Sequence, residues 1–362
     1  MKIFLDDMIL TKAHPTTAGS RMLDGYMSLF DATVAEKLVA GGHEIAGKSP
    51  VGELAIDLVG ETNYQGKGAL VDAVKSGEAE AIVCFDVNGS PRRIAAQAGL
   101  AFVKPTYGTV SRYGTVSAAC SGECVGVMAK SVADCRALLA DMVGKDERDA
   151  TMHADEVCRA ALEATAVRKV AVLKMGTAAD ESAEMAAAKA KLTANGIEIA
   201  EIDAGVIANA NTAWNMLMCA ELCNNVSRYD GIKYGYRTKN YKNLDELYTN
   251  SRTEAFGLLL KTAILYGSDV LSAKNYMGKY DKALRVRRVI VEAFAKLFAE
   301  CDAVLMPVCS KKAYTAEDSA FAENVYTAPA SITGLPAVVA GGVQLMGPAF
   351  SDGALLALAE ML

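Results

Sequence analysis

Short apolar segments with strand character recur along this chain, and helical patterns lie between them. Residues 80–85, 169–173 and 303–308 are short apolar runs with several β-branched members, as expected for buried strands. Strands that alternate with helices favour an α/β layered architecture. We therefore expect an α/β fold with a buried sheet.

The helical patterns are marked by their starts and their apolar stripes. Ser131, with Asp134 three residues later, predicts the start of a helix whose apolar stripe follows at positions 135, 138, 139 and 142. A second stripe occupies positions 286, 290, 294 and 297. Asp31 is the expected cap of a further helix that ends at Gly41 and Gly42, and residues 177–195 predict a surface helix.

Composition sets the class of protein. The chain has 362 residues, 52% of them apolar, and a net charge of −6, so a large core is expected and a strongly basic face for nucleic acid is not. No apolar run has the length of a membrane span, and the N-terminus turns acidic too early for a signal peptide. We expect one continuous domain over residues 1–362 in the cytoplasm, with no cofactor, no bound metal, no direct use of ATP and no membrane contact.

Nine cysteines are present at irregular spacings, which favours free thiols over a disulfide framework. Cys120 and Cys124, like Cys219 and Cys223, are four residues apart, but no further cluster completes a four-ligand zinc site. We interpret them as buried, unreactive cysteines.

The sequence Gly89-Ser90-Pro91 follows the first predicted strand. A glycine beside a serine can expose the hydroxyl on a tight turn, where backbone N–H groups could form an oxyanion hole. A serine needs a base within hydrogen-bond reach to act as a nucleophile, and the residues alone do not name one. A simple turn is the favoured interpretation on this basis.

Several longer motifs resemble the amidase signature family, and within it the GatA component of the tRNA-dependent amidotransferases (GatCAB complexes). They include the sequence KPTYGTVSRYGTVS at residues 104–117 and SRYDGIKYGYR at residues 227–237. Shorter matching segments lie at residues 6–12, 15–20, 31–38, 47–48, 86–92 and 327–336. The resemblance implies the amidase signature fold, a mixed β-sheet core covered by helices on both faces. It also implies shortening at the N-terminus, in one active-site loop and near the C-terminus.

The resemblance implies roles for the residues around Ser90, which falls on the family's nucleophile. Val87, Asn88 and Gly89 fall on the oxyanion-hole region. Asp86 and Arg92 match the charged pair that flanks the serine, which is expected to be structural.

Other family positions are degenerate. Asp6 stands where the family has its catalytic lysine, and Gly66 stands where it has the bridging cis-serine. Asn324 replaces an aspartate that recognises glutamine, whereas Arg287 and Tyr236 remain candidates for substrate binding. Lys67 is beside the lost cis-serine and could supply an amine, but a solvated loop lysine is the favoured interpretation.

Two main functions follow from this pattern, and a small-molecule binding module in the old pocket is a third possibility. The first is a catalytically impaired or inactive GatA-like protein that serves as a structural or assembly partner of GatB-like and GatC-like subunits, or forms a homo-oligomer. The alternative is a working glutaminase that uses Ser90 and supplies ammonia for tRNA-dependent amidation. Glutamine or another small amide is a possible ligand in either case.

Overall fold

The computed structural model describes residues 1–66 and 68–362, and its centre is one mixed β-sheet of ten strands. The strand order is β2-β1-β3-β5-β4-β9-β10-β8-β6-β7. The strands are β1 (Lys2–Asp6), β2 (Glu44–Ser49), β3 (Ala81–Asp86), β4 (Ala101–Lys104), β5 (Cys124–Ala129), β6 (Lys169–Lys174), β7 (Glu198–Asp203), β8 (Ala303–Pro307), β9 (Ala337–Ala340) and β10 (Val343–Met346).

The two ends of the sheet are parallel and its middle is antiparallel. Strand β1 pairs in parallel with β2 and β3, and β6 does so with β7 and β8. Strands β5, β4, β9 and β10 join these ends through antiparallel pairs. Strands β3, β4, β5, β8, β9 and β10 are buried along their whole length, and most of their residues are apolar.

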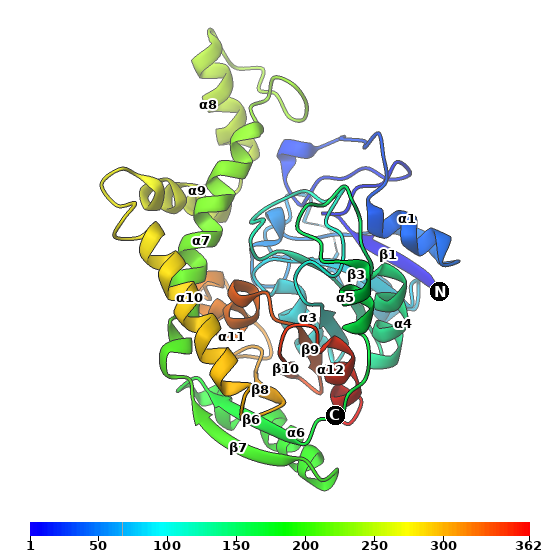
Figure 1. The fold of residues 1–362 in the computed structure, drawn as a ribbon. Coiled ribbons are helices and arrows are strands. Elements are labelled where there is room, and N and C mark those ends of the chain that lie inside the picture. The colour runs from blue at the N-terminus through cyan, green and yellow to red at the C-terminus, as the bar shows by residue number, and fades with distance from the viewer. Residues whose placement is uncertain (67) are drawn as a thin grey trace.

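Helices cover both faces of the sheet (Figure 1). They are α1 (Thr33–Ala40), α2 (Asp72–Ser76), α3 (Ser90–Ala98), α4 (Val132–Met142), α5 (Asp155–Ala160), α6 (Ala183–Ala194), α7 (Ala210–Asn225), α8 (Leu244–Ala255), α9 (Leu258–Leu271), α10 (Tyr280–Leu297), α11 (Ala320–Thr333) and α12 (Asp352–Ala359). Five short 3-10 helices are Arg21–Leu23, Glu53–Ala55, Ala178–Glu181, Gly205–Asn209 and Val226–Arg228.

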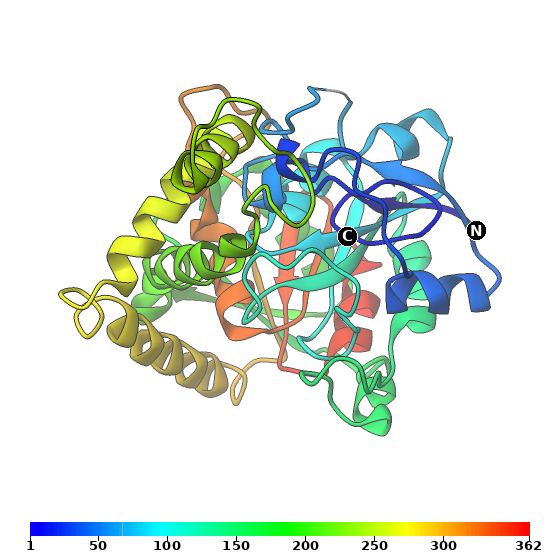
Figure 2. The same ribbon diagram turned by 90° about the horizontal axis from the view of Figure 1, so that it is seen from above.

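Helix α7 is the centre of a helical layer, because α9, α10 and α11 all pack against it. Helix α8 projects from the rest of the molecule in Figure 1. Viewed from above in Figure 2, the helices coloured yellow-green to gold lie on one side and the blue N-terminal segment lies on the other. None of the helices in the described ranges combines the length and apolar character needed to cross a membrane.

The predicted α/β elements are confirmed, with small shifts in their bounds. Residues 80–85, 169–173 and 303–308 correspond to β3, β6 and β8, and the stripe at 286–297 lies on α10. Ser131 caps α4 by accepting a hydrogen bond from the Asp134 N–H. The predicted surface helix is confined to α6, after a 3-10 turn.

The predicted cap of α1 is wrong. Its N-cap residue is Ala32, with no side-chain hydrogen bond, and Gly41 follows its last residue. The Asp31 carboxylate instead accepts a hydrogen bond of 2.8 Å from the Lys12 N–H and pairs with the Lys12 amine. Asp31 lies one position too early to cap the helix, so its charge fixes the preceding loop.

Candidate active site around Ser90

The backbone places Ser90 at the first position of α3, directly after β3 and a short turn. Gly89 precedes it with φ 90°, and a Cβ atom there would lie 2.3 Å from Cβ of Thr327. Both the backbone conformation and the contact with α11 therefore require glycine at this position. Ser90 is 5% exposed.

The Ser90 hydroxyl has one polar side-chain partner in the described part of the chain, Oδ1 of Asp57 at 3.5 Å. The same carboxylate accepts hydrogen bonds from the N–H groups of Gly60 and Thr62, at 3.1 and 2.9 Å. Burial, followed by the nearby Glu61 charge, raises the pKa of Asp57 above its usual range. Asp57 therefore organises its own loop and is also the acid–base group closest to the serine.

The backbone N–H groups beside the serine already have acceptors. The Gly89 N–H donates to Oδ1 of Asp86 at 2.9 Å, and the Ser90 N–H donates to Oδ1 of Asn88 at 3.0 Å. The Asn88 amide in turn donates to the carbonyl oxygens of Ile56 and Asp57, at 2.6 and 3.0 Å. An incoming oxyanion would have to displace these bonds to use either N–H group.

Asp86 and Arg92 form a fully buried ion pair next to this turn. Nε of Arg92 donates to Asp86 at 2.7 Å, and Nη2 donates to its other oxygen at 3.3 Å. The guanidinium also donates to the Thr327 carbonyl oxygen, Gln344 Oε1 and Ser331 Oγ. The pair thus connects β3 and α3 to α11 and β10 with its donors satisfied, which is the geometry of a structural pair.

Arg93, which the sequence analysis did not single out, is also fully buried. Its guanidinium donates to the carbonyl oxygens of Leu58, Asn88 and Asp57 at 3.0 to 3.1 Å, and to Oγ1 of Thr327 at 3.1 Å. Within the described ranges no carboxylate accepts a hydrogen bond from it, and burial lowers its pKa. The side chain therefore ties together the three segments that surround Ser90: the 56–58 loop, the serine turn and α11.

Two signals in the sequence could have pointed to this arrangement. Two adjacent arginines near the start of α3 point about 100° apart, so if one side of the helix packs on the sheet, one of them can face inward. An acidic residue in the loop before the degenerate cis-serine position was also visible. Neither signal names a partner, since Arg93 and Asp57 meet only through the tertiary fold.

Asp6 lies at the end of β1, apart from the Ser90 hydroxyl. Its carboxylate accepts hydrogen bonds from the N–H groups of Met8 and Phe85, and burial raises its pKa to about 7. The nearby Lys48 amine bonds to the Ile9 carbonyl oxygen and Oγ1 of Thr16. In the described ranges, no lysine amine lies within hydrogen-bond distance of Ser90 Oγ.

Gly66 is the residue predicted to stand at the family's cis-serine position. Gly66 has φ 61°, and its N–H donates to the Asn63 carbonyl oxygen at 3.1 Å. A glycine has no side chain that could relay a proton from Ser90. Lys67 lies outside the described residues.

Asn324 is brought close to the serine turn. With its amide nitrogen facing them, the Asn88 and Ala320 carbonyl oxygens lie at 3.1 and 3.0 Å, and the Asn215 side chain lies at 2.8 Å. Asn324 is fully buried on α11, and its side chain lies between the serine turn and Asn215 of α7.

The two candidate substrate residues are held by other groups. Arg287 on α10 donates to the Ser121 carbonyl oxygen at 2.9 Å, and burial lowers its pKa. The Tyr236 ring lies under the Arg21 guanidinium, 4.2 Å from its centroid, and its hydroxyl donates to Glu254. No hydrogen bond in the described ranges joins either residue to Ser90.

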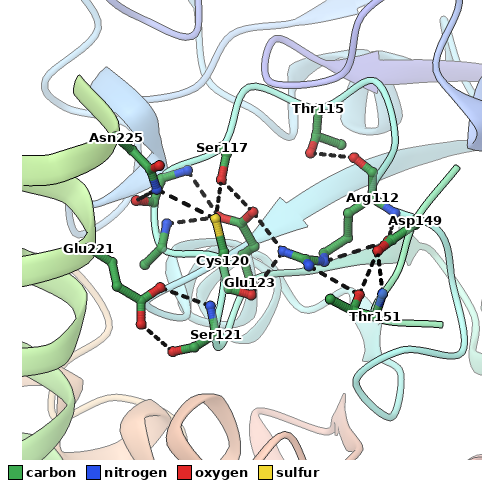
Figure 3. Close-up of polar contacts among 12 residues, drawn as sticks. Arg112, Thr115, Ser117, Cys120, Ser121, Glu123, Asp149, Thr151, Glu221 and Asn225 are labelled. Atoms are coloured by element: carbon green, nitrogen blue, oxygen red, sulfur yellow. Dashed lines mark hydrogen bonds and ion pairs between the residues drawn. The ribbon is translucent and has the colours of Figure 1, made fainter. Parts of the chain in front are cut away.

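Figure 3 shows a polar cluster in which residues of the 112–123 segment bond to one another and to Asp149, Thr151, Glu221 and Asn225. Arg112 bonds to Glu123 at 2.9 Å and to the Cys120 carbonyl oxygen, while Ser117 donates to Glu123 at 2.8 Å. Ser121 is held by Glu221 of α7. The prediction of a buried Cys120 is wrong: its loop is at the surface, with Sγ 3.0 Å from Ser117 Oγ.

Cys124 and Cys219 are buried as predicted, and Cys223 is half-buried. No group of three or more His, Cys, Asp or Glu side chains in the described part of the chain is arranged to hold a metal ion.

The chemical groups gathered around Ser90 are a hydroxyl, a carboxylate and buried guanidinium groups.

Comparisons with known proteins agree with this fold. The family model described as Amidase matches residues 1–69 and 73–356. The chain is 34% identical to the GatA component of the glutamyl-tRNA(Gln) amidotransferase of Moraxella catarrhalis, over 98% of this chain and 81% of that protein. The corresponding protein of Nitrosomonas europaea is also 34% identical, over 98% and 81%.

A solved structure gives the same result. The crystal structure of the corresponding glutamyl-tRNA(Gln) amidotransferase component from Thermotoga maritima superposes with a TM-score of 0.80 and 27% identity, over 99% of this chain and 82% of that one. The mixed ten-stranded sheet is thus the amidase signature fold. By sequence and by structure, the chain belongs to the amidase family.

Proposed function

We propose that this chain is a GatA-like protein with an impaired or inactive serine site, and that it serves as a structural or assembly component of an amidotransferase-like complex in the cytoplasm. The relatives above are components of glutamyl-tRNA(Gln) amidotransferases, which supports a role within a complex. GatB-like and GatC-like subunits are the proposed partners, with a homo-oligomer as the alternative.

One observation carries the proposal. Among the described residues, the side-chain hydrogen-bond partner of Ser90 Oγ is the Asp57 carboxylate, at 3.5 Å, while the neighbouring N–H groups are bonded to Asp86 and Asn88. A serine nucleophile must lose its proton as the new bond to carbon forms, and the developing oxyanion needs free donors. Both requirements are poorly met here. Because catalytic groups act as a unit, a defect in either one is expected to remove most of the rate.

Ammonia release from glutamine tests the proposal. We expect the wild type, Ser90→Ala and the control Ser76→Ala, a change on the distant α2, to give the same background rate. The assay is repeated with any co-purified proteins present, so that partner-dependent activity is also detected. A wild-type rate clearly above that of Ser90→Ala, with Ser76→Ala unaffected, would show a working nucleophile.

The alternative, a working glutaminase, is favoured by one specific observation. The raised pKa of Asp57 would let it accept a proton near neutral pH, and Asp57 is the group nearest the serine hydroxyl. On this alternative, wild-type turnover falls on the acid side of its pH profile as Asp57 is protonated around its pKa of about 6, and Asp57→Asn abolishes turnover.

The role within a complex is tested by assembly. On α9, Leu258 is 83% exposed and Leu265, seven residues later on the same face, is 72% exposed. Exposed apolar side chains on one helix face support contact with a partner protein. We expect light scattering to show an oligomer or a complex with a co-purified partner. Monomers at all concentrations, with no co-purified partner, would contradict the partner proposal.

A further inference from the structure

A polar cavity of about 240 Å³ lies at the ends of β1 and β2, away from the Ser90 hydroxyl. It combines one cation and one anion with hydroxyl and amide groups. Its lining residues are Asp7, Pro15, Thr17, Lys48, Ser49, Pro50, Asn63 and Gln65.

The Lys48 amine enters this cavity with one donor left over. Its side chain is 10% exposed, and two of its N–H groups are used by the Ile9 carbonyl oxygen and by Oγ1 of Thr16 at 3.3 Å. An ammonium has three donors. Among the described residues, the third faces Oδ1 of Asp7, which forms an ion pair with the amine at 3.7 Å but lies beyond hydrogen-bond distance.

The Asp7 carboxylate has a matching unused acceptor. Oδ2 accepts from the Thr17 N–H at 3.0 Å and from the Thr17 hydroxyl. Oδ1 accepts no hydrogen bond from any described residue and faces Lys48 across the 3.7 Å gap. The cavity therefore presents, side by side, one donor and one acceptor that form an ion pair without a hydrogen bond between them, both on side chains that are almost fully buried.

The width of the gap selects what can bridge it. The oxygen and nitrogen of a primary amide are about 2.3 Å apart, so with two hydrogen bonds of about 2.9 Å they fit between groups 3.7 Å apart. One water molecule bridging the same groups with tetrahedral angles would need a separation of about 4.6 Å. A ligand group with an acceptor atom and a donor atom side by side thus fits the gap between Lys48 and Asp7 better than one water molecule does.

Charge narrows the choice further. A carboxylate ligand would place a negative oxygen against Asp7, and an ammonium ligand would place a positive charge against Lys48. A neutral amide edge offers its carbonyl oxygen to Lys48 and its N–H to Asp7, so both hydrogen bonds are charge-assisted. Pro15 and Pro50 supply apolar contact for a short carbon chain.

We propose that the cavity between Lys48 and Asp7 is a binding site for a small neutral molecule with a primary amide end group. Binding there is non-covalent and involves neither Ser90 nor Asp57. The site is therefore independent of whether the serine is catalytic.

Three probes of equal size test the proposal: propionamide, propionate and propylammonium. Each is titrated into the full-length protein while the backbone amide resonances of Thr17, Ser49 and Asn63 are followed by NMR. We expect saturable shifts with propionamide, and binding at least about tenfold weaker for the other two, as expected when a charged hydrogen bond is replaced by repulsion. Equal shifts with all three probes, or no saturable shift, would overturn the proposal.

Asp7→Asn provides a change of specificity. The new amide group can present an N–H toward the ligand, so the variant is expected to favour propionate over propionamide. If this variant does not fold, Gln65→Trp at the exposed rim is used instead, and it should abolish propionamide binding. Gln97→Trp, in a separate cavity, is the matched control and should leave binding unchanged. Propionamide binding that survives Gln65→Trp places the ligand elsewhere and refutes the site.

The titration is repeated in Ser90→Ala. Unchanged propionamide binding is expected, because the serine does not line the cavity. Loss of binding in this variant would mean that the amide occupies the serine site, and would contradict the inference while leaving the proposed function to its own assay.

Discussion

The segment from residue 57 to residue 66 has two ends with opposite character. At one end Asp57 lies beside Ser90, where donors and acceptors are paired with one another and Arg93 is fully buried. At the other end Asn63 and Gln65 line a cavity in which Lys48 and Asp7 face each other across 3.7 Å. Binding capacity depends on unsatisfied groups, so the position that resembles a catalytic serine is the less available of the two.

Removing the Arg92 guanidinium, which lies beside the Ser90 turn, is expected to have the largest effect on stability. Arg92→Met leaves the fully buried Asp86 without its partner and should lower the free energy of unfolding by about 3–5 kcal/mol. Arg288→Met is the matched control, because that arginine is 77% exposed in a pair with Glu292 and should contribute less than about 0.5 kcal/mol. Urea denaturation of both variants measures the difference, and equal losses would refute a structural role for the buried pair.

Asp6 lies between the two ends and gives stability a pH dependence. Burial raises its pKa in the folded protein to about 7, from an ordinary value of 3.8. The folded state therefore binds a proton that the unfolded chain has released, and this contribution is lost as pH rises through 7. From pH 5 to pH 8 the wild type should lose about 2–3 kcal/mol through this group, and Asp6→Asn should flatten that dependence. Denaturant unfolding of both proteins at pH 5 and pH 8 measures this. If both lose the same free energy of unfolding between the two pH values, Asp6 is excluded as the source.

Replacing Arg93 should destabilise the protein less than replacing Arg92. Arg93→Met removes hydrogen bonds to neutral oxygen atoms only, and it also removes a buried cation that has no bonded carboxylate among the described residues. The two effects partly offset, so we expect a loss of about 1–2 kcal/mol, clearly less than for Arg92→Met. A loss as large as that of Arg92→Met would mean that Arg93 has a stabilising countercharge at this site.

Ser90 itself should matter least for stability. Its hydroxyl makes one side-chain contact among the described residues, at the limiting distance of 3.5 Å, so Ser90→Ala should change the free energy of unfolding by less than about 0.5 kcal/mol. Thermal denaturation is sufficient to check this. A larger loss would indicate that the Ser90–Asp57 hydrogen bond is strong, and would favour the alternative in which Asp57 activates the serine.

Much of the fold could be predicted from the sequence because its signals are local. Buried strands such as β3 and β8 are continuous apolar runs, and Ser131 begins α4 through a hydrogen bond three residues away. Asp31 shows the limit of such local signals: its carboxylate bonds a loop residue 19 positions earlier in the chain instead of the helix that follows it.

The sequence alone determined the amidase signature fold and the position of Ser90 after β3, and it predicts that Asp6 and Gly66 stand where the family has two catalytic residues. Only the tertiary structure decided what surrounds them. Arg93 bonds Thr327, 234 positions away, and Lys48 meets Asp7 across neighbouring strands. Hydrogen bonds and gaps of this kind depend on distances of a few tenths of an ångström between segments far apart in the chain, and local sequence patterns carry no information about those distances.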